Sequence, residues 1–240
     1  MFEQFPKRRI ELPENYKKIY LEHYRKNRAG ATPATFLSSK MEKWMHRKVA
    51  EDCLNGVTKS TLELGAGTLN HLTYERNTPY DIVEPFSELY NGLEELTKIS
   101  SIYSDIAEID TGKKYDRIIS IANFEHILNL PEVVARAALL LNNSGVLRVG
   151  MPTEGGFLWK LGYTITTGAE FRLKYGLKYS VLMKHEHVST ADEIEEILKY
   201  FFEDVTCFFL GFSKNISFYR FYTCALPNKN KASKYLEAFN

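Results

Sequence analysis

The residues with the clearest chemical potential lie in the stretch Thr61–Thr68, which reads TLELGAGT. An apolar run that contains Glu63 leads there directly into a Gly-x-Gly turn formed by Gly65 and Gly67. Glycine has no β-carbon, so its backbone can adopt a positive φ and a ligand can approach it closely. The same pattern also occurs in ordinary turns. The turn therefore predicts a binding site only together with the segments that follow it.

Polar side chains follow three further apolar runs, each at the point where a strand is expected to end. The run 80–83 ends in Glu84, the run 101–104 ends in Asp105, and the run 115–122 ends in Asn123. Nucleotide-binding α/β proteins carry a ribose-binding carboxylate about 20 residues after the glycine turn, which is where Glu84 stands. Each carboxylate alone could be a solvated strand end. Because parallel strands bind ligands at their carboxyl ends, the set together predicts a nucleotide site.

These segments together resemble the class I S-adenosylmethionine-dependent methyltransferases. ELGAGT is similar to the glycine-rich first motif of that family, IVEP to its second strand end, and SDIAEI to its third. YDRIISIANFEHI and NNSGVLRVGMP resemble its fourth and fifth strands. The resemblance covers residues 61–152 and extends more loosely to Leu226. Leu69 stands where many members have a third glycine, which leaves the local path of the turn open.

The resemblance implies S-adenosylmethionine as cofactor, S-adenosylhomocysteine as product, and a site at the strand ends. Glu63 would hold the cofactor amine, Glu84 both ribose hydroxyls and Asp105 the exocyclic adenine amine. The full set of cofactor residues implied by the motif positions is Glu63, Gly65, Ala66, Gly67, Thr68, Glu84, Pro85, Asp105, Ile106, Asn123 and Phe124.

His126 is the candidate catalytic base. Methyl transfer from a sulfonium is an in-line displacement in which the protein mainly aligns the reactants and excludes water. A base is needed only when the acceptor is a hydroxyl or a charged amine. His126 follows the fourth strand, at the edge where a substrate must enter, and an unperturbed histidine has a pKa of about 6.5. The alternative is a structural histidine at the start of a helix.

Residues 153–188 are expected to form an irregular insert that recognises the substrate, because they show no clean period and are rich in aromatic and basic residues. The candidate substrate-binding residues are Trp159, Arg172, His185 and His187. Rings stack on sugar faces and bases pair with phosphate, so the insert suits a small molecule or a carbohydrate such as a nucleotide sugar. It would also suit peripheral membrane contact, or the rings could simply fill a cap. His185 and His187 lack a third ligand in the sequence, so no metal is expected.

The order of the predicted elements indicates a single α/β domain over residues 1–240. We expect a Rossmann-like, doubly wound, mostly parallel seven-stranded sheet with helices on both faces and a C-terminal antiparallel hairpin. Its expected parts are an N-terminal helical cap (1–56), a cofactor-binding core (57–152), the insert (153–188), a helix and hairpin (189–226) and a tail (227–240). The hairpin separates this layout from that of a dehydrogenase, whose sheet ends in parallel strands.

Hydrophobic spacing predicts helices over residues 14–28, 40–54, 86–98, 133–141 and from about residue 191. Ser38 or Ser39 is expected to cap the second of these, and Ser189 or Thr190 the last, with Asp192 and Glu193 available for a capping box. His46 is expected to be structural or solvated. Residues 142–145 should end the helix before the fifth strand, and the tail from Asn228 should fray.

Composition limits the partners and the cellular environment that the sequence indicates. The chain has 240 residues, a net charge of +1 and three cysteines that lie far apart. The charge does not indicate a nucleic-acid partner, and no apolar run reaches the length of a membrane span. The cysteines are expected to be reduced in a cytoplasmic protein, and the sequence leaves the oligomeric state open.

The sequence therefore predicts a methyltransferase that acts on an oxygen or nitrogen of a small-molecule or carbohydrate acceptor, with a carbohydrate of surface-polysaccharide type among the candidates. One alternative is a nicotinamide-dependent oxidoreductase, which shares the glycine turn but would not need a carboxylate at Asp105 or the terminal hairpin. The other is a methyltransferase-like binding subunit without turnover.

Overall fold

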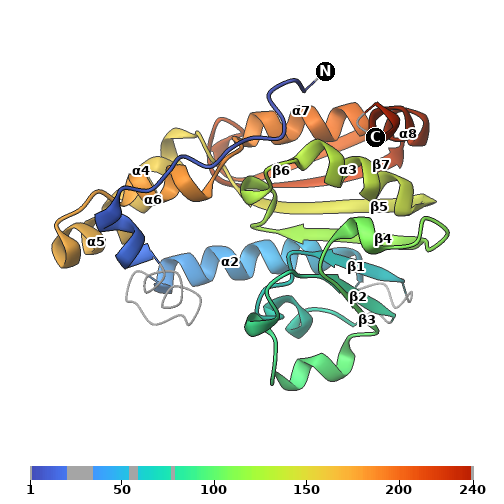
Figure 1. Cartoon of the computed structure of the whole chain (residues 1–240), viewed down its shortest axis with the longest axis horizontal. Coiled ribbons are helices and arrows are strands. Elements are labelled where there is room, and N and C mark those ends of the chain that lie inside the picture. The colour runs from blue at the N-terminus through green and yellow to red at the C-terminus, as the bar shows by residue number, and fades with distance from the viewer. Residues whose placement is uncertain (1, 21–34, 54–58, 77–78, 239–240) are drawn as a thin grey trace.

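The computed structural model of the chain describes residues 2–20, 35–53, 59–76 and 79–238 (Figure 1). They form a seven-stranded sheet with the order β3-β2-β1-β4-β5-β7-β6, in which only β7 runs against the other strands. This sheet confirms the predicted fold class. The strands are β1 (Thr61–Leu64), β2 (Tyr80–Val83), β3 (Ser101–Tyr103), β4 (Tyr115–Ile121), β5 (Leu141–Pro152), β6 (Phe202–Ser213) and β7 (Ile216–Pro227).

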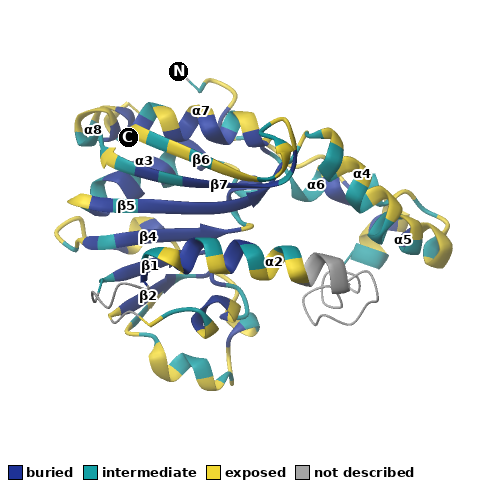
Figure 2. Cartoon of the chain, turned by 180° about the vertical axis from the view of Figure 1, so that it is seen from behind, coloured by how far each residue is buried: buried dark blue, intermediate teal, exposed yellow. Residues whose placement is uncertain are grey.

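Helices lie on both faces of the sheet. α3 (Leu130–Leu140), α7 (Ala191–Phe201) and α8 (Lys229–Glu237) cover one face, and α2 (Thr35–Ala50) covers the other, as Figure 1 shows. Successive side chains of a strand point to opposite faces, so each strand contributes to two cores. The central strands are accordingly buried along their length (Figure 2).

Strand β4 shows how the two cores are built. Ile118 packs in the core beneath α3, α7 and α8, whereas its neighbour Ile119 packs in the core that α2 covers with Met45 and Val49. Both isoleucines are fully buried. A largely apolar run is the pattern expected of a strand that is covered on both faces, and the isoleucines at 118, 119 and 121 are the part of β4 that shows it.

The start of α7 also follows the prediction. Thr190 caps the helix and forms a capping box with Glu193, whose carboxylate accepts from the Thr190 N–H at 2.8 Å while the threonine hydroxyl accepts from the Glu193 N–H at 3.3 Å. The hairpin of β6 and β7, joined through Lys214 and Asn215, is confirmed as well.

The predicted helix over residues 86–98 is wrong. The chain forms two 3-10 turns there, Ser87–Leu89 and Glu94–Lys98. Gly92 lies between them with a φ of +83°, a conformation that a continuous helix cannot contain. Two leucines at helical spacing still contact the core that α2 covers: Leu93 directly before the second turn, and Leu96 within it.

Three other boundaries differ from the prediction. α2 begins at Thr35, so Ser38 and Ser39 lie within the helix rather than at its start. Residues 142–145 do not end a helix but belong to β5. The register of the pairing between β4 and β5 shifts at these residues, which form an irregularity in the strand. The first predicted helix is present over residues 14–20, and its remainder, including Tyr24, lies outside the described residues.

The insert 153–188 is helical rather than irregular. It contains α4 (Phe157–Ile165), α5 (Thr167–Tyr175) and α6 (Tyr179–Glu186), each of eight or nine residues. Helices this short gain most of their stability from tertiary packing, which a sequence period does not reveal. Here Phe171 and Leu182 form a small core with Leu12 and Tyr16 from the N-terminal segment.

The tail beyond Asn228 forms a helix instead of fraying. In α8, Ala232 and Tyr235 are buried in the same core as α3 and α7. Asn228 caps the helix, since its Oδ1 accepts from the Lys231 N–H at 3.0 Å. Among the residues that the structure describes, no helix combines the length and apolar composition that a membrane span requires.

We expect the Asn228→Ala variant to unfold with a free energy about 1 kcal/mol lower than that of the unchanged chain, because an N-cap hydrogen bond is lost. Urea denaturation followed by circular dichroism measures this. Asn228→Ser keeps a capping oxygen and should stay close to the unchanged chain. Equal stability of all three proteins would contradict the packing of α8 as part of the cooperative fold.

Candidate active site

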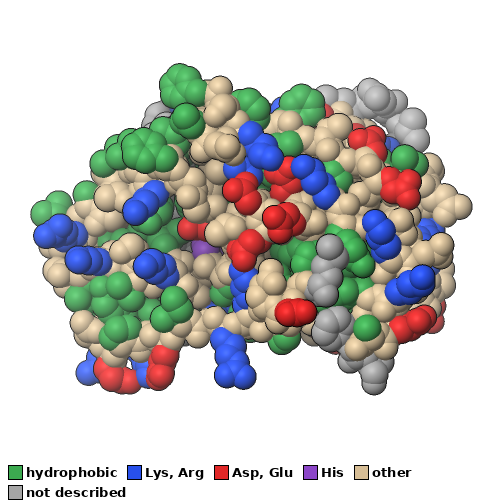
Figure 3. All heavy atoms as spheres, turned by 90° about the horizontal axis from the view of Figure 1, so that it is seen from above, with side chains coloured by type: hydrophobic (Ala, Val, Ile, Leu, Met, Phe, Trp, Pro, Cys, Tyr) green, Lys and Arg blue, Asp and Glu red, His purple; other side chains and the backbone are tan. Residues whose placement is uncertain are grey.

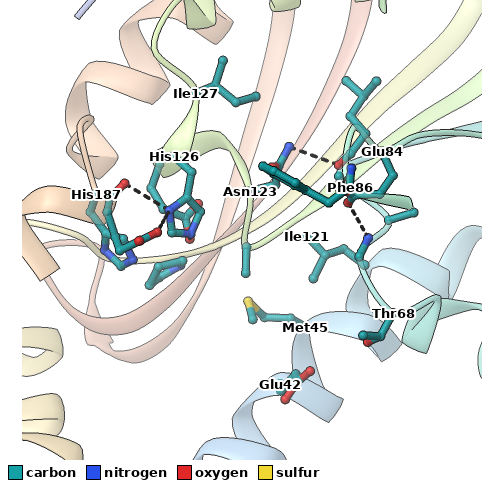
Figure 4. Close-up of a pocket in the computed structure, with 18 of the residues that line it drawn as sticks. Glu42, Met45, Thr68, Glu84, Phe86, Ile121, Asn123, His126, Ile127 and His187 are labelled. Carbon is teal, nitrogen blue, oxygen red and sulfur yellow. Dashed lines mark hydrogen bonds and ion pairs between the residues drawn. The ribbon is translucent and has the colours of Figure 1, made fainter. Parts of the chain in front are cut away.

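A cavity of about 930 Å³ opens at the carboxyl ends of the parallel strands. Its walls come from the ends of β1, β2 and β4, from α2, from the insert helices and from Arg9 and Tyr20 of the N-terminal segment. Figure 4 shows two ends: Glu84, Phe86 and Thr68 lie on one side of Ile121 and Asn123, and His126 and His187 lie on the other.

The glycine turn allows a very close approach of Asn123. Gly65 has a φ of +76° and Gly67 a φ of +54°. A β-carbon on Gly65 would lie 2.3 Å from Cγ of Asn123, whose amide donates to the Leu64 carbonyl at 3.2 Å. Leu69 also has a positive φ, +59°. The turn therefore follows the left-handed path of a third glycine although a leucine stands there.

The two predicted nucleotide carboxylates line the same cavity end. Glu84 is 5% exposed and accepts from the Gly67 N–H at 2.7 Å and the Phe86 N–H at 3.1 Å, one bond to each oxygen. Asp105 is exposed and accepts from the Ala107 N–H at 2.8 Å. Each carboxylate oxygen has more than one lone pair, so both groups can accept further bonds from a ligand.

Glu63 is a buried carboxyl group at the floor of this end. Its Oε2 accepts from the Tyr80 hydroxyl at 2.7 Å. Burial raises the pKa of Glu63 to about 8, although the tyrosine hydrogen bond and the charge of Arg117 act in the opposite direction. The charges of Glu75 and Glu84 add to the increase in pKa. The carboxyl group is therefore largely protonated at neutral pH.

A pair of histidines also reaches this cavity, which the sequence did not indicate. His46 on α2 and His71 have their Nδ1 atoms 3.1 Å apart, and their rings are stacked. Both are buried and both line the cavity. Burial, together with the neighbouring His46, lowers the pKa of His71 well below its usual value. A neutral His71 can form a hydrogen bond with His46 without repulsion between two charged rings.

At the other end, Glu125, His126 and His187 form a compact cluster. One ligand atom of each lies within 4.8 Å of the others. His126 Nε2 is 3.8 Å from Glu125 Oε1, and the rings of His126 and His187 meet edge to face with their centres 4.8 Å apart. Figure 4 shows the two imidazoles side by side.

A further acidic residue contacts the Nδ1 atom of each imidazole in the cluster. His126 Nδ1 lies 3.1 Å from the Glu186 carbonyl oxygen and 3.4 Å from its Oε2. His187 Nδ1 lies 2.6 Å from Glu154 Oε2, which also accepts from the Trp159 indole N–H at 2.5 Å. These contacts orient both rings with Nε2 left for other partners.

The charges of the cluster depend on one another. Burial opposes the charged form of His126, but the hydrogen bond to Glu186 and the charge of Glu125 prevail, so the pKa of His126 is raised. Burial likewise disfavours the Glu186 carboxylate, yet His126, Tyr20 and Arg9 lower its pKa to about 2. Glu154 has a lowered pKa despite its burial because His187 pairs with it.

The predicted site residues divide into two groups. The structure brings together in the cavity lining Glu63, Gly65, Ala66, Gly67, Thr68, Glu84, Pro85, Asp105, Ile106, Asn123, His126, Trp159 and His187. Phe124, Arg172 and His185 do not belong to the lining. Their predicted placement in the site is corrected as follows.

Phe124 is fully buried in the core beneath α3, because the 3-10 turn after β4 turns its ring inward. Arg172 is exposed on the outer surface of α5. Figure 3 shows basic side chains among hydrophobic ones at the end of the molecule formed by α4–α6. His185 packs against the N-terminal segment, where its Nδ1 lies 2.6 Å from the Ile10 carbonyl oxygen.

Several lining residues were not predicted. Tyr163, Tyr179 and Met183 from the insert helices line the cavity beside Trp159. Arg9 and Tyr20 reach it from the N-terminal segment, with Tyr20 in contact with Glu186. The aromatic content of the insert was a signal for the first group, whereas no pattern in the sequence indicated Arg9.

Comparison with solved structures identifies proteins with a similar fold and low sequence identity. The plantazolicin methyltransferase BpumL, in complex with a monoazolic desmethylPZN analog and SAH, matches with a TM-score of 0.56 and 19% identity over 87% of this chain and 90% of that chain. A SAM-dependent methyltransferase from Thermotoga maritima, described as a possible histamine N-methyltransferase, matches with a TM-score of 0.55 and 15% identity over 88% of this chain and 97% of that chain.

The N-methyltransferase NodS from Bradyrhizobium japonicum WM9, in complex with S-adenosyl-L-homocysteine, matches with a TM-score of 0.53 and 13% identity over 88% of this chain and 99% of that chain. No protein-family model and no curated protein sequence matches the chain. Likeness at these identities concerns the arrangement of helices and strands. The chain thus has the fold of the class I S-adenosylmethionine-dependent methyltransferases.

Proposed function

We propose that the chain is an S-adenosylmethionine-dependent methyltransferase that transfers the methyl group to an oxygen or nitrogen of a small molecule. The observation that carries the proposal is the joint position of Glu84 and Asp105 at one end of a cavity, above the turn at Gly65 and Gly67. The structural neighbours bound to S-adenosylhomocysteine support the same cofactor.

In the proposed complex the cofactor extends along the strand ends. Glu84 accepts the ribose hydroxyls, Asp105 accepts from the adenine amine, and Ile106 packs on the adenine ring. The glycine turn and Glu63 hold the amino-acid part. This orientation directs the sulfonium past Asn123 toward the cluster of Glu125, His126 and His187. The protein then aligns the acceptor with the methyl group and excludes water.

The acceptor end favours a small molecule with a ring or apolar body. Trp159, Tyr163, Tyr179 and Met183 supply the apolar walls. Glu125 and Glu186 line the same end, and Arg9 is the only Lys or Arg among the described lining residues. Phosphate groups are recognised by several bases, so a nucleotide-sugar acceptor has less support than an amine or a neutral hydroxyl compound. Two of the neighbours are described as N-methyltransferases or possible ones.

His126 remains the proposed base for an acceptor that must lose a proton. It lines the acceptor end, and Glu186 orients its ring through Nδ1. This role requires that Nε2 is available to the acceptor.

Titration calorimetry tests the proposed function. S-adenosylhomocysteine should bind with a stoichiometry of about one, and nicotinamide dinucleotides should not bind. The reverse result would favour the oxidoreductase. Transfer of label from S-adenosylmethionine to small-molecule amines and hydroxyl compounds would then separate an enzyme from a binding subunit, since a subunit without turnover binds the cofactor but transfers no label.

Cofactor binding should release a proton from Glu63. The pKa of this carboxyl group is raised to about 8 in the free protein, and a cofactor ammonium group beside it favours the carboxylate. Binding therefore lowers the pKa, so up to one proton is released below pH 8 and the affinity rises as the pH rises from 6 to 8, by at most about tenfold per unit.

Calorimetry in buffers with different ionisation enthalpies measures this proton. The groups that face Glu63 are the Tyr80 hydroxyl, Glu75, Arg117 and Glu84. In Glu63→Gln the release of the proton should disappear. Proton uptake, or the same release in the Gln variant, would show that another group titrates.

A further inference from the structure

We propose that Glu125, His126 and His187 form a binding site for one divalent transition-metal ion at the acceptor end of the cavity. The sequence alone argued against a metal because His185 and His187 lacked a third ligand. The fold supplies two further ligands from a distant segment. Glu125 and His126 belong to the 3-10 turn after β4 (Phe124–His126), and the structure places them beside His187.

The ligand set is one that such ions use. Two imidazoles and one carboxylate occur in catalytic zinc sites and in the facial triad of iron(II) enzymes, both of which keep positions open for a substrate. Ligands at about 2.1 Å from a zinc ion lie roughly 3.4 Å from one another in a tetrahedral arrangement. The ligand atoms here lie within 4.8 Å, and His126 Nε2 is 3.8 Å from Glu125 Oε1. A movement of about 1 Å by these side chains would close the site around such an ion.

Glu125 independently points to a missing partner. Its side chain is 2% exposed, and Oε2 has no hydrogen-bond partner among the described residues. A buried carboxylate oxygen without a partner is costly, and native structures rarely leave one unexplained. Because Oε1 is the oxygen nearer to His126, an ion between Glu125 and the two imidazoles would satisfy Oε2 when the carboxylate binds it through both oxygens.

The contacts that His126 and His187 make through Nδ1 are of the kind found around metal-binding histidines. Such histidines commonly use one ring nitrogen for the metal and the other for a carboxylate or backbone carbonyl, which fixes the ring. Glu154 occupies Nδ1 of His187 at 2.6 Å, and the Glu186 carbonyl lies 3.1 Å from Nδ1 of His126. Both Nε2 atoms are thereby left for the ion.

Backbone contacts hold the two ligand segments together without an ion. The Glu125 carbonyl accepts from the Val188 N–H at 2.8 Å and from the Ser189 N–H at 3.3 Å. Arg9 donates to the His126 carbonyl at 3.1 Å and to the Glu186 carbonyl at 3.0 Å. The ligands are therefore positioned by the fold itself, so binding needs little reorganisation.

The place of the ion in the cavity suggests its use. All three ligands line the acceptor end, so the open positions of the ion would face an acceptor oxygen or nitrogen. A cation there would orient that atom and favour its deprotonated form. This use rests on the proposed methyl transfer, whereas ion binding itself does not. An Nε2 that binds the ion cannot accept a proton, so His126 would then be a ligand and not the base.

Metal binding to the chelator-treated full chain tests the proposal. We expect calorimetry with Zn²⁺ to give one ion per chain, and Co²⁺ to give visible absorption bands from a site with nitrogen ligands. His187→Ala should lower the Zn²⁺ affinity by about 100-fold or more, and Glu154→Gln, which removes only the supporting carboxylate, by about 10- to 100-fold. The matched control is His185→Ala, because His185 lies two positions before His187 and outside the cavity. The Zn²⁺ affinity of this variant should equal that of the unchanged chain.

The outcomes are separable from the test of the proposed function. Absence of Zn²⁺ and Co²⁺ binding would overturn the metal site, as would equal affinities of the unchanged chain, His187→Ala and Glu154→Gln. Loss of Zn²⁺ binding in His46→Ala but not in His187→Ala would place the ion at the His46–His71 pair. That result would also overturn the proposed site at Glu125, His126 and His187. Circular dichroism of each metal-free variant confirms that the variant is folded. S-adenosylhomocysteine affinity of the same variants tests the methyltransferase proposal separately from the metal.

Discussion

Glu84→Ala should lower the affinity for S-adenosylhomocysteine by about 1.5–3 kcal/mol, the usual loss for a hydrogen bond to a charged group. This corresponds to roughly a 10- to 150-fold increase in Kd. The carboxylate is expected to accept both ribose hydroxyls, and it is already positioned by the N–H groups of Gly67 and Phe86. Alanine would remove the ligand contacts and the support of the turn together.

The control for this prediction is Glu88→Ala. Glu88 follows Glu84 by four residues, is exposed, and does not belong to the cavity lining. Calorimetry should give this variant the affinity of the unchanged chain. If Glu84→Ala also kept that affinity, Glu84 would have to be removed from the proposed site.

Gly65→Ala should be the most damaging single substitution at the site. The residue has a φ of +76°, and its new β-carbon would lie 2.3 Å from Cγ of Asn123. A left-handed conformation costs an alanine about 1–2 kcal/mol, and overpacking adds about 1–3 kcal/mol. We therefore expect the free energy of unfolding to fall by about 2–5 kcal/mol, with loss of measurable cofactor binding because Asn123 is displaced into the site.

Gly92→Ala separates the two causes. Gly92 has a φ of +83°, but a β-carbon there would have no neighbour within 4 Å. Urea denaturation should show only the conformational cost, about 1–2 kcal/mol, and calorimetry should show normal cofactor binding. The double variant Gly65→Ala with Asn123→Ala should regain part of the lost stability. Equal stability of Gly65→Ala and Gly92→Ala would mean that the contact with Asn123 is unimportant.

The strands could be predicted from sequence because their signal is local. Strands covered on both faces require continuous apolar runs, and Ile118 and Ile119 of β4 show both faces buried. Glu84 and Asp105 directly follow such runs, so the carboxyl edge of the sheet brings them together. The capping box of Thr190 and Glu193 could also be predicted from sequence, because it depends on residues only three positions apart.

The errors fall where long-range packing outweighs local pattern. The leucines of residues 86–98 have helical spacing, but the positive φ of Gly92 divides the segment into two turns. The short helices of the insert are stabilised by the N-terminal segment, for example through Tyr16 against Phe171. Such contacts join residues more than a hundred positions apart, and no local period encodes them.

The sheet and the end of the cavity that contains Glu84, Asp105 and the glycine turn could be predicted from sequence, because these features depend on residue types at fixed short spacings. The other end of the cavity depends on contacts between distant segments, which only the folded chain reveals. His126 and His187 meet because the Glu125 carbonyl accepts from the N–H groups of Val188 and Ser189, which lie more than sixty positions along the chain. Which histidines face the cavity is set by this packing, and so the fold alone could exclude His185 and bring Glu125 to His187.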